Sequence, residues 1–156
     1  VREWTNWYAA QGIQSSPTVF NFFLPNYQLP GEVASSGLYS PEFQITTDTF
    51  LTRLSNEIAG KIYYAYVGNP WLGEWQPVLI RLERDMGIAH DAAALIDRFN
   101  LLFMAGQMSS GMRDVLISHV NAIDFNQWTP DADTRRQRVQ DALWLILTSP
   151  EYVVEK

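Results

Sequence analysis

Two tryptophans flank a glutamate in the stretch Trp71-Leu72-Gly73-Glu74-Trp75, which lies between prolines. Aromatic faces stack on sugar rings, and a carboxyl group can serve as the general acid in glycoside hydrolysis. Trp71 and Trp75 are therefore candidate substrate-binding residues, and Glu74 is a candidate catalytic acid. Because tryptophan side chains are highly buried on average, we favour the alternative that both indoles pack into the core beneath this loop.

Glycoside hydrolysis also needs a second carboxyl group about 5–9.5 Å from the first. The acidic side chains considered for this role are those of Glu57, Glu83 and Asp85. The sequence does not fix which of them lies beside Glu74. We retain Glu57 as the second candidate catalytic carboxylate.

Two histidines, His90 and His119, could also carry acid–base chemistry. His119 falls within a predicted helix, near its apolar stripe, and would be a general base if an aspartate and a serine lay close by. The chain has no Gly-x-Ser-x-Gly nucleophile motif and no His-Glu-x-x-His zinc motif. We favour structural or surface roles for both histidines, and we predict no metal site and no cofactor.

Two charged clusters lie near the start of the last predicted helix. Asp131-Ala132-Asp133 could open a calcium loop, but the glycine and distal glutamate of an EF-hand are absent, so helix capping is the favoured interpretation. Arg135, Arg136 and Arg138 could form an anion-binding patch or pair with acids across the bundle. A solvated helix face is the default interpretation for these arginines.

The segment from Phe20 to Tyr27 is rich in aromatic residues and is framed by Pro17, Pro25 and Pro30. It belongs to residues 14–41, an irregular stretch that is too apolar for a solvated linker, so we expect 14–41 to form an ordered strap that lies over a helical core. The aromatic segment could instead dock a partner, because aromatic anchors dominate binding hot spots. We favour the packing role, and we note that an uncovered apolar strap would encourage self-association into a homo-oligomer.

Apolar residues at helical spacing, with capping residues before them and glycines after them, predict an all-α fold. The expected architecture is an irregular multi-helix bundle with a long aromatic and proline-rich N-terminal strap. We expect one domain over residues 1–156, with a helix and the strap in 1–40 and the bundle in 41–156. The expected helices cover about 1–13, 41–66, 78–86, 91–105, 110–120, 131–147 and 150–154.

Composition excludes several classes of function. The 156 residues include no cysteine, which excludes disulfides and thiolate chemistry. A net charge of −6 argues against non-specific nucleic-acid binding, which needs an excess of Lys and Arg. We find no stretch long enough to span a membrane and no signal peptide in this chain. Because the chain begins with Val1, we expect a fragment of a longer protein or a processed chain.

Three motifs in the same order resemble a bacterial family called domain of unknown function 1800. They are Ser16-Pro17-Thr18-Val19-Phe20-Asn21-Phe22-Phe23-Leu24-Pro25-Asn26-Tyr27, then Leu95-Ile96-Asp97-Arg98-Phe99-Asn100-Leu101-Leu102, and finally Leu145-Ile146-Leu147-Thr148-Ser149-Pro150-Glu151-Tyr152. The resemblance covers nearly the whole chain and implies the C-terminal third of an exported protein, periplasmic or extracellular. It carries over no catalytic residue.

Together these observations predict a non-catalytic helical scaffold or interaction domain from the C-terminal part of an exported bacterial protein. Its partner would be the missing N-terminal part of its own family or another protein. The alternative is a hydrolase that acts on polysaccharide, with Glu74 as acid and the two tryptophans as a sugar platform. Whether the chain is an enzyme is left open at this point.

Overall fold

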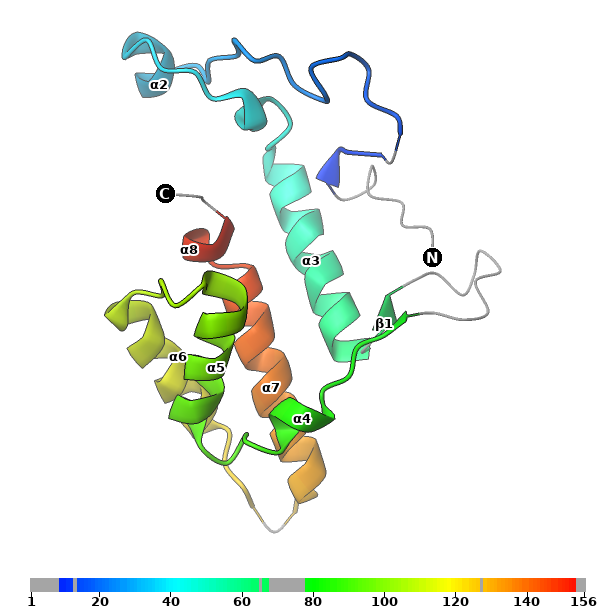
Figure 1. Cartoon of the computed structure of the whole chain (residues 1–156), viewed down its shortest axis with the longest axis vertical. Coiled ribbons are helices and arrows are strands. Elements are labelled where there is room, and N and C mark those ends of the chain that lie inside the picture. Colours follow the sequence, from blue (N-terminus) through cyan, green and yellow to red (C-terminus); the bar gives the residue numbers. More distant parts are fainter. Residues whose placement is uncertain (1–8, 13, 65, 68–77, 127, 154–156) are drawn as a thin grey trace. The chain divides into compact units, whose positions relative to one another are not determined.

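The computed structural model describes residues 9–12, 14–64, 66–67, 78–126 and 128–153. These residues form seven α-helices, one 3-10 helix (η1) and one pair of two-residue strands, so the predicted all-α class is confirmed (Figure 1). In chain order the elements are α2 (Glu32–Ser35), η1 (Pro41–Gln44), α3 (Asp48–Tyr64), β1 (Tyr66–Val67), β2 (Val78–Leu79), α4 (Glu83–Met86), α5 (Ala92–Met104), α6 (Ser110–Ala122), α7 (Asp131–Leu147) and α8 (Pro150–Val153).

The described chain divides into two compact units. The first includes residues 9–12 and 14–57, and the second includes 58–64, 66–67, 78–126 and 128–153. The division falls inside α3, between Glu57 and Ile58. The expectation of one domain with a boundary near residue 40 is not tested by this division and stays a prediction.

The second unit holds every buried apolar side chain of the described residues. In it, α5, α6 and α7 lie side by side (Figure 1). The residues that meet between them are Leu95, Ile96 and Phe99 on α5, Leu116 and Val120 on α6, and Val139, Ala142, Leu143 and Ile146 on α7. Their three-and-four spacing is that of helices buried along one face. The predicted bundle is confirmed in this unit, although Leu101 and Val115, which we had placed on apolar stripes, are exposed.

α5 and α6 each begin with a side-chain cap, as the general capping pattern of the sequence indicates. Asp91 accepts a hydrogen bond from the Ala94 backbone N–H at 3.0 Å, and the Ser109 hydroxyl accepts one from Met112 N–H at 3.2 Å. These contacts satisfy N–H groups that a helix cannot pair internally. At the other end of α5, Gly106 has φ 80° and its N–H reaches Asn100 O at 3.0 Å, a left-handed ending that glycine adopts without strain.

The helix predicted over 41–66 is wrong at both ends. Pro41–Gln44 is a separate 3-10 turn, the α-helix begins at Asp48, and it ends at Tyr64. The physical reason at the start is that Ser40 does not cap: its hydroxyl instead accepts the Leu29 N–H at 2.9 Å. After the helix, Tyr66–Val67 pairs antiparallel with Val78–Leu79, and there the sequence had suggested helix.

Two other predicted helices are also too long. Ala10 has φ 55° and residues 10–12 are not helical, so the helix expected over 1–13 does not extend to its predicted end; residues 1–8 and 13 lie outside the described part. The helix expected over 78–86 is reduced to α4, because Val78–Leu79 is a strand. In both places the apolar residues were too few to distinguish helix from extended chain.

The solvated arginine face predicted for α7 is wrong at Arg138. This side chain is only 5% exposed and donates to Ile123 O at 2.9 Å and to Ala89 O at 3.1 Å. Its guanidinium also lies 4.5 Å from the centre of the Phe125 ring. The two carbonyls belong to the turn before α5 and to the end of α6, so one charged side chain of α7 fastens both to the bundle.

We expect Arg138→Met to lower the free energy of unfolding by about 2–4 kcal/mol, because two buried carbonyls would lose their charged donor. Urea denaturation followed by circular dichroism measures this loss. The matched control is Arg136→Met, which replaces an exposed arginine of the same helix and should change stability by less than about 0.5 kcal/mol. Equal effects of the two substitutions would show that the Arg138 contacts do not stabilise the fold.

Candidate functional site

The residues that the sequence singled out do not form one described site. Trp71, Glu74 and Trp75 lie outside the described residues, so the predicted sugar platform stays a prediction. Glu57 belongs to the first compact unit and His119 to the second. The two candidates therefore belong to different units, and the contacts of His119 are described within its own unit.

His119 on α6 is held by an aspartate that sequence analysis missed. Its Nε2 lies 3.2 Å from Asp141 Oδ2 on α7, and the other carboxylate oxygen, Oδ1, accepts the Tyr63 hydroxyl of α3 at 2.6 Å. The Asp141 side chain is 15% exposed, whereas that of His119 is 45% exposed. A mostly buried carboxylate thus joins three helices at this cluster.

The cluster orients His119 in the way an aspartate orients a catalytic histidine. When Nε2–H of neutral His119 donates to Asp141, Nδ1 is left as the acceptor nitrogen. Tyr63 binds the carboxylate of Asp141, whereas the serine of a catalytic triad binds the free nitrogen of the histidine, so Tyr63 does not stand in the position of a nucleophile. Partial burial of Tyr63, which is still 41% exposed, together with the hydrogen bond to Asp141 and its negative charge, raises the pKa of Tyr63 above its ordinary value of 10.0. The two bonds of Asp141 to side chains of two other helices are those of a structural tie.

His90 and Asp131 contribute to a second cluster, at the start of α7. The His90 ring stacks on Phe125 with centroids 4.4 Å apart, and its Nε2 is 3.8 Å from Asp131 Oδ1. Asp131 Oδ2 binds Arg135 Nη2 at 2.6 Å. α7 begins at Asp131, Pro130 is at the N-cap position and no side chain caps the helix. The predicted capping role of Asp131 is therefore wrong, because Asp131 is already the first helical residue. The described residues hold no group of three His, Asp or Glu side chains placed to bind a metal ion.

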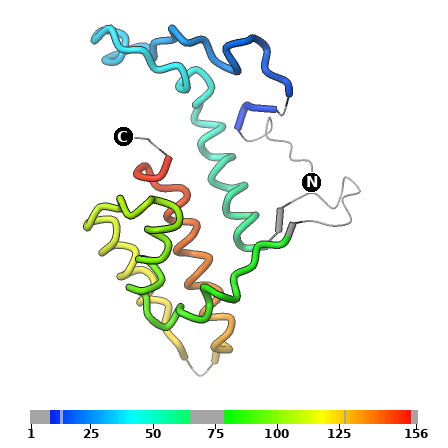
Figure 2. The backbone as a smooth tube through the Cα atoms, viewed as in Figure 1, coloured from blue at the N-terminus to red at the C-terminus, as the bar shows by residue number. Residues whose placement is uncertain are grey.

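The strap of the first unit, residues 14–44, forms the other candidate site. Figure 2 shows it as an irregular path with only short helical turns. Hydrogen bonds hold this path: Leu24 N–H donates to Gln44 Oε1 at 2.8 Å, and Ser40 N–H donates to Tyr27 O at 2.8 Å. These bonds join the middle of the strap, at Leu24 and Tyr27, to its C-terminal end at Ser40 and Gln44.

A tight turn in the strap presents two apolar side chains to solvent. Asn21 N–H donates to Thr18 O at 3.2 Å, and Phe20 N–H donates to the Thr18 hydroxyl at 3.1 Å. Asn21 has φ 72°, a left-handed conformation that asparagine tolerates better than most residues. Val19 and Phe20 form the tip of this turn and are 94% and 57% exposed.

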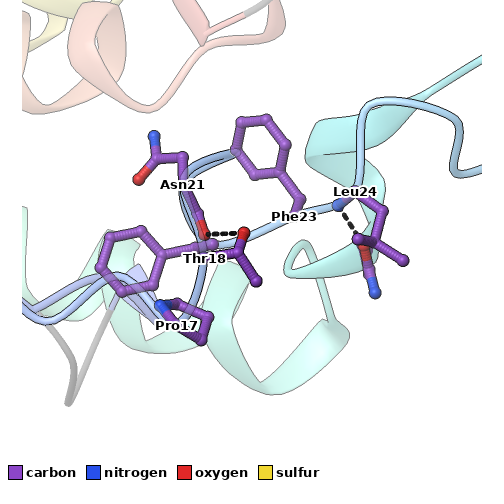
Figure 3. A pocket seen from close by; sticks show the side chains of 7 residues that line it. Pro17, Thr18, Asn21, Phe23 and Leu24 are labelled. Atoms are coloured by element: carbon purple, nitrogen blue, oxygen red, sulfur yellow. Dashed lines mark hydrogen bonds between the residues drawn. The ribbon is translucent and has the colours of Figure 1, made fainter.

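Beside the turn lies a mostly apolar hollow of about 210 Å³. Figure 3 shows Pro17, Thr18, Asn21, Phe23 and Leu24 around it. The amide of Gln44 also borders the hollow, and its oxygen is held by Leu24. The strap thus combines a hydrogen-bonded frame, an apolar hollow and exposed apolar tips, which is the composition of a recognition surface.

Comparison of the chain with family models, curated proteins and solved structures gave no match. The resemblance to the domain of unknown function 1800 family therefore stays a prediction. No helix in the described part of the chain combines the length and apolarity that crossing a membrane requires.

The raised pKa of Tyr63 predicts a loss of stability at alkaline pH. A phenol whose folded-state pKa is raised stabilises the fold fully below the unfolded pKa of about 10, and this stabilisation is lost as pH rises above it. We expect Tyr63→Phe to be less stable than the parent protein at pH 8 and to show a weaker further loss above about pH 10. Urea unfolding at both pH values measures this.

The control is Tyr39→Phe, which removes an exposed hydroxyl from the strap. This variant should keep the full alkaline loss of the parent chain. If Tyr63→Phe kept it as well, the bond between Tyr63 and Asp141 would not be the source of the alkaline loss.

Proposed function

We propose that this chain is a non-catalytic helical scaffold or interaction domain, and that the strap is its partner-binding element. The proposal includes its origin in the C-terminal part of an exported bacterial protein, periplasmic or extracellular, to which the sequence motifs point. The observation that carries it is the turn from Thr18 to Asn21, which holds Val19 and Phe20 in a defined and exposed position. Surfaces of this kind mark interaction sites more often than random exposure does.

The polar groups of the second unit support the non-catalytic part of the proposal. Arg138 and Gln140 donate to backbone carbonyls, and Asp141 binds Tyr63 and His119. Glu151 of α8 accepts both the backbone N–H and the hydroxyl of Ser109 at the start of α6. These groups are occupied in holding helices together, and chemistry would require them to break those contacts.

Two kinds of partner fit this function. One is the N-terminal part of the family that the sequence resembles, and the other is a separate protein. Self-association through the strap is the competing outcome, because exposed aromatic side chains also favour homo-oligomers. In each case aromatic and aliphatic side chains of the strap would anchor the contact.

The alternative function is hydrolysis of polysaccharide. It rests on Glu74 between Trp71 and Trp75, and one described feature favours it: His119 is oriented by Asp141 as a general base would be. A sugar-binding role for the two indoles would make the polysaccharide the ligand of this chain. We rank this function second because the described contacts of Asp141 connect helices, with Tyr63 on one oxygen and His119 on the other.

An interaction role for the strap predicts that its exposed tips contribute little to stability. We expect the double variant Val19→Ser, Phe20→Ser to lower the free energy of unfolding by less than about 0.5 kcal/mol, as surface substitutions do. The contrasting control is Phe99→Ala in the bundle core, which should cost about 3–5 kcal/mol. Urea denaturation measures both. A loss above about 2 kcal/mol in the double variant would identify these side chains as packing residues and contradict the proposal.

The hydrolase alternative predicts turnover of polymeric glycans that depends on Glu74. If it holds, Glu74→Gln should lower kcat by at least about 100-fold, because the general acid would be lost. Release of reducing ends measures activity, and Glu32→Gln is the matched control that should remain active. Full activity of Glu74→Gln would remove Glu74 from the mechanism, and inactivity of the parent chain on glycans and esters would favour the scaffold function.

A further inference from the structure

We infer that the strap binds a basic amphipathic segment of a partner protein. This inference rests on the proposed function and adds the chemistry of the partner to it. The partner would insert apolar side chains around the Val19–Phe20 tip and the adjacent hollow, and its Lys or Arg residues would face the acidic groups of the strap. Two independent features of the strap support this inference, its exposed apolar side chains and its distribution of charge.

The apolar feature extends beyond the turn. Leu38 and Tyr39 are 60% and 66% exposed, and Phe43 is 48% exposed. Phe43 lies in η1 next to Gln44, whose side chain holds Leu24 and borders the hollow. An amphipathic helix recognises such a surface by placing apolar anchors at i, i+3, i+4 and i+7 into it.

The second feature is charge: the strap has acidic residues and no basic residues. Between Arg2 and Arg53 the sequence contains no Lys, Arg or His. The acidic residues of the described part of that stretch are Glu32, Glu42 and Asp48, and all three are exposed. Glu42 directly precedes Phe43, and Glu32 opens the short helix α2 before Leu38 and Tyr39. The cationic flanks of a partner would therefore meet Glu42 next to Phe43, whose neighbour Gln44 borders the hollow, and Glu32 in the helix before Leu38 and Tyr39.

Charge also argues against a second copy of this chain as the occupant. The whole chain carries a net charge of −6, so two copies repel each other. A neutral apolar partner would leave the acidic groups of the strap without a counter-charge at a desolvated contact, which is costly. Complementary charge across an interface steers encounter and excludes wrong partners. The basic amphipathic partner is the one that satisfies both features.

The experiment uses three synthetic peptides of about 18 residues, long enough to form a helix. All carry leucine at helical spacing, and their polar face is lysine in the first, glutamine in the second and glutamate in the third. Fluorescence anisotropy at low and at physiological salt measures binding to the full chain. We expect the lysine peptide to bind at least about ten-fold more tightly than the glutamine peptide at low salt, and less so as salt rises.

Variants of the chain locate the contact. The double variant Val19→Ser, Phe20→Ser should bind the lysine peptide at least about ten-fold more weakly than the parent chain does. The double variant Glu32→Gln, Glu42→Gln should bind the lysine peptide about three- to ten-fold more weakly, and its affinity for the glutamine peptide should stay the same. The matched control is Asp114→Asn with Asp133→Asn, which removes the same charge from exposed positions on α6 and α7 and should change binding by less than about two-fold.

Each other outcome overturns the inference in a distinguishable way. If the lysine and glutamine peptides bind equally and the Val19 and Phe20 variant binds neither, the partner is not basic. The proposed interaction function of the strap then still holds. An equal effect of the two charge-neutralising pairs shows only non-specific attraction. Dimers by light scattering that dissociate in the Val19 and Phe20 variant make a second copy the occupant. Absence of all binding by a monomeric chain removes the inference, and the proposed function then rests on the stability of the strap variant.

Discussion

The fold of the second unit depends on hydrogen bonds that side chains donate to buried backbone carbonyl groups. Helices end with carbonyl groups that they cannot pair internally, and burying such a group unpaired is costly. Here α7 supplies the donors. Arg138 serves Ile123 O and Ala89 O, and Gln140 Nε2 serves Ile62 O at 2.9 Å and Tyr63 O at 3.2 Å. One central helix thus fixes the ends of α3 and α6 and the turn before α5.

This constraint also determines where chemistry can occur. A polar side chain that holds a buried carbonyl cannot leave it without exposing an unsatisfied group. Among the buried side-chain polar atoms of the described chain, Trp144 Nε1 alone has no partner. With that exception, the buried side-chain polar atoms that the structure describes are paired. Exposed apolar side chains occur in both units, among them Val19 and Phe20 on the strap and Leu101 and Val115 on α5 and α6.

Sequence patterns predicted the features that are set locally. The all-α class, the Asp91 and Ser109 caps and the hairpin of α5 and α6 follow from spacing and from preferences within a few residues. Arg138 could not be assigned in the same way, because its acceptor Ala89 O lies 49 positions away in the chain. A signal was present: Arg138 lies four residues before Ala142 and directly before Val139, on the buried stripe of α7. Read as part of an arginine cluster, it was placed on the wrong face.

The tripeptide Ser-Pro-Glu, which occurs twice, shows why capping preferences within a few residues do not determine the local structure. At residues 149–151 it behaves as a helix start: the Ser149 hydroxyl accepts the Tyr152 N–H at 3.2 Å, while Glu151 reaches Ser109 on another helix. At residues 40–42 the same tripeptide begins only a 3-10 turn, because the Ser40 hydroxyl accepts the Leu29 backbone N–H and does not cap a helix. Capping chemistry states what a serine can bind. The surrounding chain determines which donor is available, and at Ser40 that donor is the Leu29 N–H, so a 3-10 turn forms in place of a longer helix.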